Sequence, residues 1–140
     1  MGDRIPPYRL DMCGRLPGLA HLTDVWRGPL ANVLPAMARP GIVVDCRSAE
    51  YATAWRPTGP LAERTVVLKG RPCGRRQARA PAHTAKHTRG LVARRIVTDA
   101  LDPPRPEGLV EALSEHFAVE LRRPDRPGRT LELHVAELPG

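Results

Sequence analysis

The order of apolar and polar positions predicts helices that alternate with short strands. Residues 1–20 hold so many Pro and Gly residues that we expect extended or looped chain there. Apolar residues then recur at helical spacing from Val25 to Leu34, and Thr23 is the expected N-cap of this helix. The chain is therefore predicted to open with a loop and a helix.

Two short apolar runs predict strands. The run over residues 41–46 is continuous and rich in β-branched side chains, which is typical of a strand covered on both faces, and residues 65–68 repeat the pattern. Between them, Ser48 is placed to cap a short helix that ends at Trp55-Arg56-Pro57. Residues 70–82 are poor in apolar side chains and predict a loop or a damaged strand.

The C-terminal half predicts two helices and a hairpin. Apolar stripes at helical spacing predict helices over residues 85–101 and 107–117. Apolar and polar residues then alternate at 119–121 and 131–135 on either side of a turn. The whole pattern predicts a mixed α/β (α+β) fold, with a short mixed sheet, packed helices and a C-terminal antiparallel hairpin, in a single domain over residues 1–140 with no internal linker.

Composition narrows the class of protein. No apolar run approaches the ~20 residues that cross a bilayer, and Met1–Arg4 is not followed by the apolar stretch of a signal peptide, so we expect a cytoplasmic protein without membrane partners. Cys13, Cys46 and Cys73 are odd in number and widely spaced, which predicts reduced thiols. Cys73 lies among arginines and is the best candidate for a peroxide-sensitive thiol, although we favour an inert loop thiol.

Basic charge is concentrated in one segment of the chain. The formal net charge is +7, yet residues 64–98 hold ten basic residues and no acid, so the rest of the chain is net negative by three. Clustered cations gain affinity for phosphates by releasing counterions, which favours DNA or another phosphate-bearing ligand as partner. Only Lys69 and Lys86 are lysines, however, and an Arg-, Pro- and Ala-rich composition is also what a GC-rich coding sequence produces.

Two segments combine features of anion binding. Arg47-Ser48-Ala49-Glu50-Tyr51 follows a predicted strand and opens a helix, where free backbone N–H groups bind anions, with a plain capped helix as the alternative. Lys86 and Arg89 lie near the predicted start of the next long helix, where positive charge opposes the helix dipole, and Gly90 indicates a close backbone approach. The predicted nucleic-acid- or anion-binding residues are Arg47, Ser48, Glu50, Tyr51, Lys86 and Arg89.

Metal binding and catalysis have less support in the sequence. His83 and His87 would share one helix face, but the adjacent Lys86 disfavours a cation, so neither a metal site nor a cofactor is predicted. Glu50 and Tyr51 are candidates for a proton-transfer pair, yet no Ser-His-Asp or Cys-His arrangement accompanies them. Whether the protein is an enzyme is left open, and a non-enzymatic protein is favoured.

Three segments, read in order, carry a family resemblance. They are Pro7-Tyr8-Arg9-Leu10-Asp11-Met12, Asp45-Cys46-Arg47-Ser48-Ala49-Glu50-Tyr51 and Ala85-Lys86-His87-Thr88-Arg89-Gly90. With the intervening Leu16-Pro17-Gly18-Leu19, Trp26-Arg27 and Trp55-Arg56-Pro57, they resemble the C-terminal half of the YaaA peroxide stress family over nearly the whole chain.

The resemblance implies a cytosolic protein of the hydrogen peroxide response, in a family that limits oxidative damage by restraining intracellular iron and is linked to DNA binding. The family's N-terminal half, expected to carry a DNA-holding helix-hairpin-helix, has no counterpart here. Ala82 stands where Ser is usual, and residues 77–81 replace a strand. These departures predict a truncated, partly degenerate copy with a partial YaaA-like fold, which self-associates or lacks a partner half. The alternatives are an enzyme of the same fold acting on a nucleotide or other anionic small molecule, and a remnant without activity.

Overall fold

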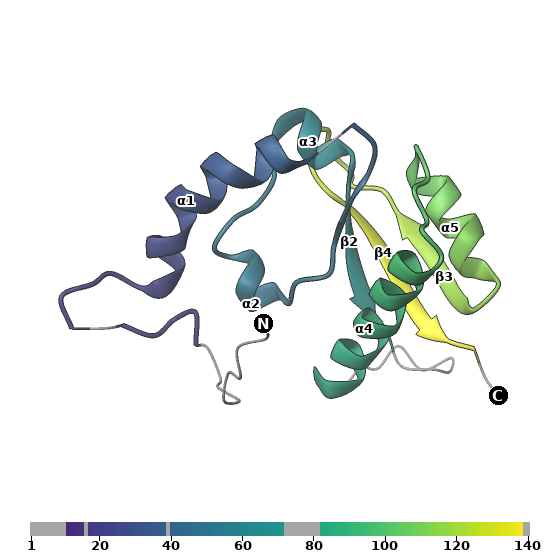
Figure 1. Ribbon diagram of the computed structural model, residues 1–140, viewed down its shortest axis with the longest axis horizontal. Coiled ribbons are helices and arrows are strands. Elements are labelled where there is room, and N and C mark those ends of the chain that lie inside the picture. Colours follow the sequence, from purple (N-terminus) through teal and green to yellow (C-terminus); the bar gives the residue numbers. More distant parts are fainter. Residues whose placement is uncertain (1–10, 16, 39, 72–81, 139–140) are drawn as a thin grey trace, which may run out of the picture.

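A computed structural model describes residues 11–15, 17–38, 40–71 and 82–138 of the chain. The elements in chain order are α1 (Leu22–Met37), β1 (Val43–Asp45), α2 (Ala49–Ala52), α3 (Gly59–Glu63), β2 (Thr65–Gly70), α4 (Ala82–Thr98), α5 (Pro106–Ser114), β3 (Phe117–Arg122) and β4 (Leu131–Glu137) (Figure 1). The segment predicted as a loop or a damaged strand over residues 70–82 is shorter than predicted, because Gly70 belongs to β2 and Ala82 begins α4. Residues 72–81, which include Cys73 and the strand replacement at 77–81, fall outside the described ranges. No described helix has both the length and the apolar composition needed to cross a bilayer.

The four strands form one mixed sheet in the order β1-β2-β4-β3. β1 runs parallel to β2, and β2 runs parallel to β4. β3 and β4 form an antiparallel hairpin in which Val119 lies opposite Val135. The strict alternation in both hairpin strands sends their apolar side chains to one face, which fixes this register. The predicted mixed sheet, C-terminal hairpin and α+β class are therefore confirmed.

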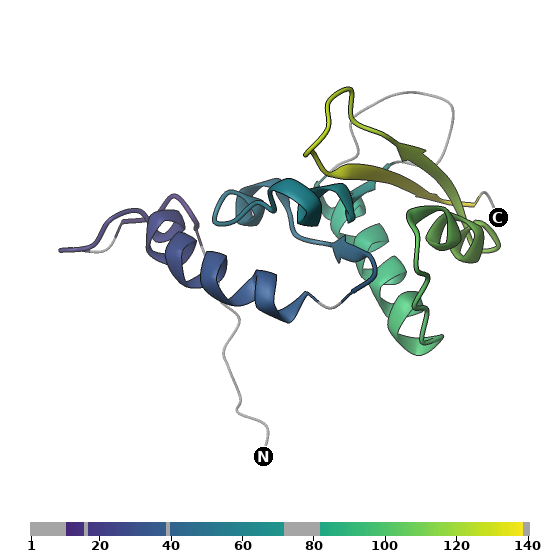
Figure 2. The ribbon, with the colours of Figure 1, turned by 90° about the horizontal axis from the view of Figure 1, so that it is seen from above.

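The core lies between the sheet and the two helices α4 and α5, which cover one of its faces (Figures 1 and 2). Its buried residues are Val66, Leu68, Val92, Leu109, Leu113, Phe117, Leu131, Leu133 and Val135. Aliphatic side chains make up all but one of them, which agrees with an aromatic content of only 4% in the sequence. The alternate residues of the same strands, among them Lys69, Glu132 and His134, face away from these helices.

The start of α4 packs directly against the end of β2. A Cβ atom on Gly70 would lie 2.7 Å from Cα and 2.9 Å from the carbonyl oxygen of Ala85, which is closer than any side chain tolerates. Glycine at position 70 therefore permits this close packing of helix on strand. Because β1 is parallel to β2, both strands have their C-terminal ends on the same side of the sheet, where α4 begins. We call this side the C-terminal edge of the strands.

Three predictions about the helices are wrong in detail. Thr23 does not cap α1, because the helix begins at Leu22 and the Thr23 hydroxyl donates to the carbonyl of Met12 at 2.7 Å. Phe117 begins β3 and does not end α5. The spacing of apolar residues over 85–101 predicts Val97 as part of the stripe, but Val97 is 77% exposed, since Ile96, the residue before it, packs against the core.

β1 is an edge strand, although its sequence predicts a strand covered on both faces. Only β2 pairs with it among the described strands, and its three residues are half-buried. α1 precedes it and lies beyond this edge of the sheet, on the side away from β3 (Figure 1). None of the residues of α1 is buried. The β1 edge of the sheet is thus less covered than the sequence led us to expect.

Candidate anion-binding site

Arg47, the first of the predicted site residues, is held by its own neighbours at the end of β1. Its Nε and Nη2 donate to the carboxylate of Asp45 at 2.9 and 2.7 Å. Nη2 also donates to the carbonyl of Trp55 at 3.0 Å, and the guanidinium lies 5.4 Å from the centroid of the Trp55 ring. Arg47 is therefore already paired, which makes it a support for the site more than a ligand for an external anion.

Asp45 is the carboxylate that fixes this arginine. Burial raises the pKa of its carboxyl, but the side-chain and backbone hydrogen bonds from Arg47, with the charges of Arg47 and Lys69, outweigh burial and hold the pKa below its usual value. The Asp45 side chain is only 9% exposed. The pair is thus a largely buried support for the start of α2.

α2 begins as the sequence predicts, with Ser48 as its N-cap. The Ser48 hydroxyl accepts a hydrogen bond from the N–H of Tyr51 at 3.5 Å, a long and weak cap. Glu50 is the second residue of α2, where it cannot complete a capping box, and its Oε1 accepts the backbone N–H of Met12 at 3.4 Å. α2 has only four residues, so its dipole is small, and an anion here depends on cations from another element.

α4 supplies a cation at this place through Arg89. The start of α4 packs on Gly70 at the end of β2, and Arg89 follows Ala85 by one turn of this helix. Burial and the Asp45 carboxylate raise the pKa of the Cys46 thiol, and the charge of Arg89 acts in the opposite direction. Lys86 lies one turn earlier on α4 and is exposed. Within the described part of the chain, the side chains of Lys86 and Arg89 form no ion pair and no hydrogen bond.

Described residues of the three segments of the family resemblance therefore lie at one end of the sheet. The hydrogen bond from Met12 to Glu50 joins the first segment to the second, and the packing of Ala85 on Gly70 of β2, the strand beside β1, brings the third segment to the same end. Arg47, Ser48, Glu50 and Arg89 thus lie around the end of β1. Glu50 and Tyr51 on α2 and Lys86 on α4 are the exposed members of the predicted set.

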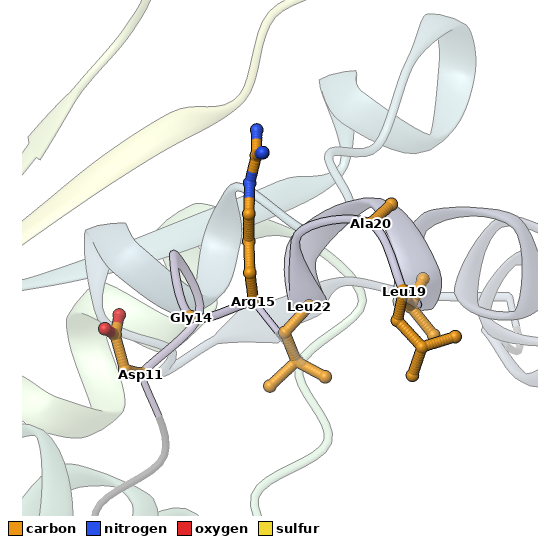
Figure 3. Close-up of a pocket in the computed structure, with 7 residues that line it drawn as sticks. Asp11, Gly14, Arg15, Leu19, Ala20 and Leu22 are labelled. Carbon is orange, nitrogen blue, oxygen red and sulfur yellow. The ribbon is translucent and has the colours of Figure 1, made fainter. Parts of the chain in front are cut away.

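Sequence reasoning missed the organisation of residues 11–21. Arg15 donates through Nε to Nε2 of His21 at 3.0 Å, and Nδ1 of His21 lies 2.8 Å from the carbonyl of Cys13. Since Arg15 donates to Nε2, Nδ1 carries the proton and donates to Cys13. Leu19 and Leu22 line an adjacent cavity of about 220 Å³ and point to one side, while Arg15 points to the other (Figure 3). This apolar cavity is separate from the candidate anion site.

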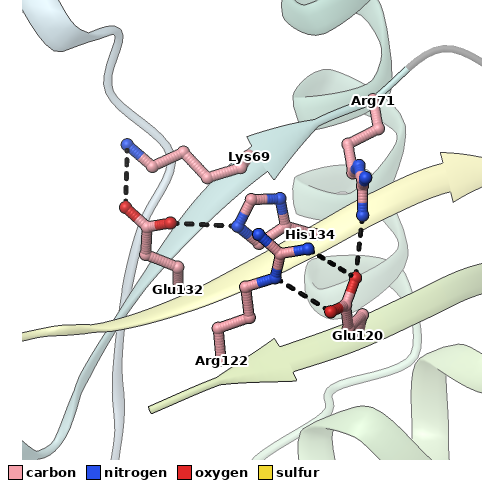
Figure 4. A network of polar contacts seen from close by, with 6 residues as sticks. All are labelled: Lys69, Arg71, Glu120, Arg122, Glu132 and His134. Carbon is pink, nitrogen blue, oxygen red and sulfur yellow. Dashed lines mark hydrogen bonds and ion pairs between the residues drawn. The ribbon is translucent and has the colours of Figure 1, made fainter. Parts of the chain in front are cut away.

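A second polar cluster lies on the sheet face opposite α4 and α5. It consists of Lys69, Arg71, Glu120, Arg122, Glu132 and His134 (Figure 4). Lys69 Nζ lies 3.5 Å from Glu132, and Arg71 Nη1 lies 2.8 Å from Glu120. Two cations of the predicted basic segment are therefore neutralised by carboxylates, one from β4 and one from β3.

The basic segment over residues 64–98 does not form a continuous cationic surface in the described part of the chain. Arg64 donates to the backbone carbonyls of Gly41 at 2.6 Å and Ala38 at 3.1 Å, and Arg95 pairs with Asp99. Arg75, Arg76 and Arg79 lie outside the described residues. The cations of this segment that have no ion pair in the described ranges are Lys86, Arg89 and Arg94.

The histidines and the proton-transfer candidates are engaged elsewhere or exposed. His83 and His87 are exposed on α4, and Nε2 of His87 lies 4.0 Å from Glu137. No group of three His, Cys, Asp or Glu side chains is placed to hold a metal ion among the residues that the structure describes. In those same ranges, no Ser or Cys side chain hydrogen-bonds to a histidine or a carboxylate.

Gly90 also differs from its prediction. A Cβ atom built on Gly90 would meet no atom within 4 Å, so nothing in the described chain approaches its backbone closely. The residue is exposed in the middle of α4. Its cost to the helix therefore has no compensation within the described residues.

Comparison with known proteins gives consistent matches. A family model described as peroxide stress protein YaaA matches residues 1–122. A UPF0246 protein of Streptomyces coelicolor is 41% identical over 136 residues, which cover 96% of this chain and 52% of that protein. A UPF0246 protein of Cereibacter sphaeroides is 33% identical over 131 residues, which cover 89% of this chain and 50% of that protein. A UPF0246 protein of Roseobacter denitrificans is 28% identical over 133 residues, which cover 89% of this chain and 51% of that protein. The chain spans about half the length of these relatives, and no solved structure matches it significantly.

Proposed function

This chain belongs to the peroxide stress protein YaaA family, and from that premise we propose that it acts in the response to hydrogen peroxide by binding phosphate groups of DNA. The proposed site is the sheet edge where β1 and β2 end. The observation that carries the proposal is the packing of the start of α4 on Gly70 at the end of β2, because Arg89, one turn after Ala85 on this helix, has no ion pair in the described part of the chain. Lys86 adds a second such cation one turn away.

The absence of carboxylate partners at Lys86 and Arg89 matters energetically. A phosphate that approaches Lys69 or Arg71 competes with Glu132 or Glu120, so binding there breaks an existing ion pair. A phosphate at Lys86 and Arg89 breaks no such pair in the described residues. In open sheets with parallel strands, ligands also bind outside the carboxyl ends of the strands, which is the edge in question.

The other predicted residues take different roles in this proposal. The Ser48 hydroxyl lies at the same edge and supplies a neutral donor to a phosphate. Arg47 is a positioning residue, because Asp45 and Trp55 already hold its guanidinium. Glu50 carries a negative charge that repels phosphate, so its proposed role is to hold Met12 in place.

We further propose that binding of this kind protects DNA and so limits oxidative damage in the cytoplasm. The restraint of intracellular iron that the family resemblance implies belongs to the same proposal. It is assigned to no residue of the described part.

A pair of matched double variants tests the phosphate site. Lys86→Ala/Arg89→Ala is expected to weaken binding of a fluorescently labelled DNA duplex about tenfold or more, since each charge-assisted contact contributes about 1.5–3 kcal/mol. Arg126→Ala/Arg129→Ala removes the same charge from the turn between β3 and β4, at the opposite sheet edge, and is expected to bind like the parent. Circular dichroism checks that both variants are folded. Equal affinity of the two double variants would overturn the proposal.

A further inference from the structure

α1 carries an apolar stripe that no described residue buries. Leu22, Trp26, Pro29, Val33 and Met37 recur at the spacing of one helix face. Trp26 is 45% exposed, Val33 51% and Met37 69%. An amphipathic helix of a folded protein normally packs such a stripe against a core, because burial of apolar surface is what stabilises the helix. The charged Asp24 and Arg27 neutralise each other at 2.9 Å, so they present no unpaired charge to an apolar partner.

β1 offers an unpaired edge on the same side of the molecule. The N–H of Val43 donates to the carbonyl of Arg64, next to β2, at 2.9 Å. Since the peptide groups of successive strand residues point to opposite sides, those of Val44 point away from β2, toward the outer edge. Apolar edge strands left open in this way promote pairing with another chain.

Two hollows join α1 to this edge. They measure about 460 and 420 Å³, and both are lined by Leu34 of α1, Val43 of β1 and Trp55. The stripe of α1, the outer edge of β1 and these hollows form one continuous region, which we name the α1–β1 surface. In the strand order it lies at the β1 end of the sheet, and β3 of the hairpin lies at the other end (Figures 1 and 2).

We propose that the α1–β1 surface docks the half of the family's polypeptide that this chain does not span. The curated relatives are about twice as long as the matched region, so each contains a second portion of similar length. An open strand edge beside an unburied amphipathic helix is what remains when a sheet and its core are divided between two polypeptide segments. The partner segment adds a strand beside Val44 and packs apolar side chains on the stripe of α1.

Co-expression tests the docking directly. The full chain, carrying an affinity tag, is produced together with the part of the Streptomyces coelicolor relative that lies outside the 136 matched residues. Light scattering after size exclusion is expected to show a 1:1 complex. Tryptophan emission is expected to shift to the blue in the complex as Trp26 and Trp55 become covered, and the shift should be smaller in a Trp26→Phe variant.

Substitutions on α1 locate the interface. Val33→Asp/Met37→Asp places charge on two exposed side chains, so the fold is retained while affinity for the partner segment is expected to fall about tenfold or more. Val97→Asp is the control, because Val97 is 77% exposed on α4, away from this surface. Circular dichroism confirms the helix content of each variant.

Three results would overturn the proposal. The first is the absence of any complex with the relative's segment, and the second is a complex that Val33→Asp/Met37→Asp leaves intact. The third is a homodimer of the chain that the same variant abolishes, which would show that a second copy covers the surface. None of these results bears on Lys86 and Arg89, so failure of the docking proposal is distinguishable from failure of the DNA-binding proposal.

Discussion

The carboxylate of Glu50 accepts a hydrogen bond from the backbone N–H of Met12, 38 residues earlier in the chain, at 3.4 Å. Met12 itself is 3% exposed, and its carbonyl accepts the Thr23 hydroxyl at 2.7 Å. Both backbone groups of one buried residue are thus held by side chains from two distant segments. Among the predicted anion-binding residues, Glu50 carries a negative charge that repels an anion. Its hydrogen bond to Met12 holds two segments of the chain together.

Glu50→Gln separates the charge of Glu50 from its hydrogen bond. The amide oxygen keeps an acceptor for Met12, while the loss of one negative charge is expected to raise DNA affinity several-fold at low salt. Glu50→Ala also removes the acceptor and is expected to lower the free energy of unfolding by about 1 kcal/mol. Binding titrations and urea unfolding measure the two effects. Weaker DNA binding by Glu50→Gln would show that the carboxylate itself contacts the ligand.

DNA binding by the parent chain is expected to be weak, independent of sequence and sensitive to salt. If Lys86 and Arg89 each contact one phosphate, the slope of log affinity against log salt should be roughly −2, because each contact releases about 0.9 counterion. Titrations with two unrelated duplexes at several salt concentrations give this slope. Binding that is absent at low salt contradicts the proposal. Selective binding of a free nucleotide with a shallow slope would instead favour the enzyme alternative.

The Asp45–Arg47 pair is expected to make stability depend on pH in the acid range. The folded-state pKa of Asp45 is lowered, so the pair stabilises the protein fully above the unfolded-state value of about 3.9 and loses this effect as pH falls through the folded-state value. Asp45→Asn should cost on the order of 1–3 kcal/mol near neutral pH, since it leaves Arg47 without its carboxylate. It should also flatten the acid limb of a stability profile measured by urea unfolding. An unchanged acid limb would assign the pH dependence to other carboxyls.

Substitution by alanine is expected to have opposite effects on stability at Gly90 in α4 and at Gly70 in β2. Gly90→Ala adds a methyl group to open space in the middle of α4, so it is expected to stabilise the protein by up to about 1 kcal/mol. If the DNA backbone approaches α4 at this point, the same substitution will also weaken binding. Thermal melts and DNA titrations of one variant therefore report on both effects.

Gly70→Ala is expected to destabilise the protein, by about 1–3 kcal/mol. The new Cβ atom would lie 2.7 Å from the Cα of Ala85, so β2 and α4 must separate. Because α4 carries Arg89, this separation should also reduce DNA binding. A Gly70→Ala variant as stable as the parent would show that the contact between helix and strand is looser than the structure has it.

Local patterns in the sequence were sufficient to predict most of the elements. The alternation in residues 131–135 fixes which side chains of β4 face the core, because successive side chains of a strand point to opposite faces. Ser48 at the start of α2 is likewise a local feature, since a cap satisfies backbone groups within one helical turn. The individual strands and the C-terminal hairpin follow from such short-range rules.

Partners across the sequence were decided only by the tertiary structure. The ten cations over residues 64–98 could not show that Lys69 and Arg71 meet Glu132 and Glu120, because those pairings depend on the register of β2, β4 and β3. The apolar run of β1 likewise could not show that the strand lies at an edge, since strand order depends on how the whole chain is connected. A sequence specifies which face a side chain takes by rules that act over a few residues. What that side chain meets there is set by contacts between segments far apart in the chain.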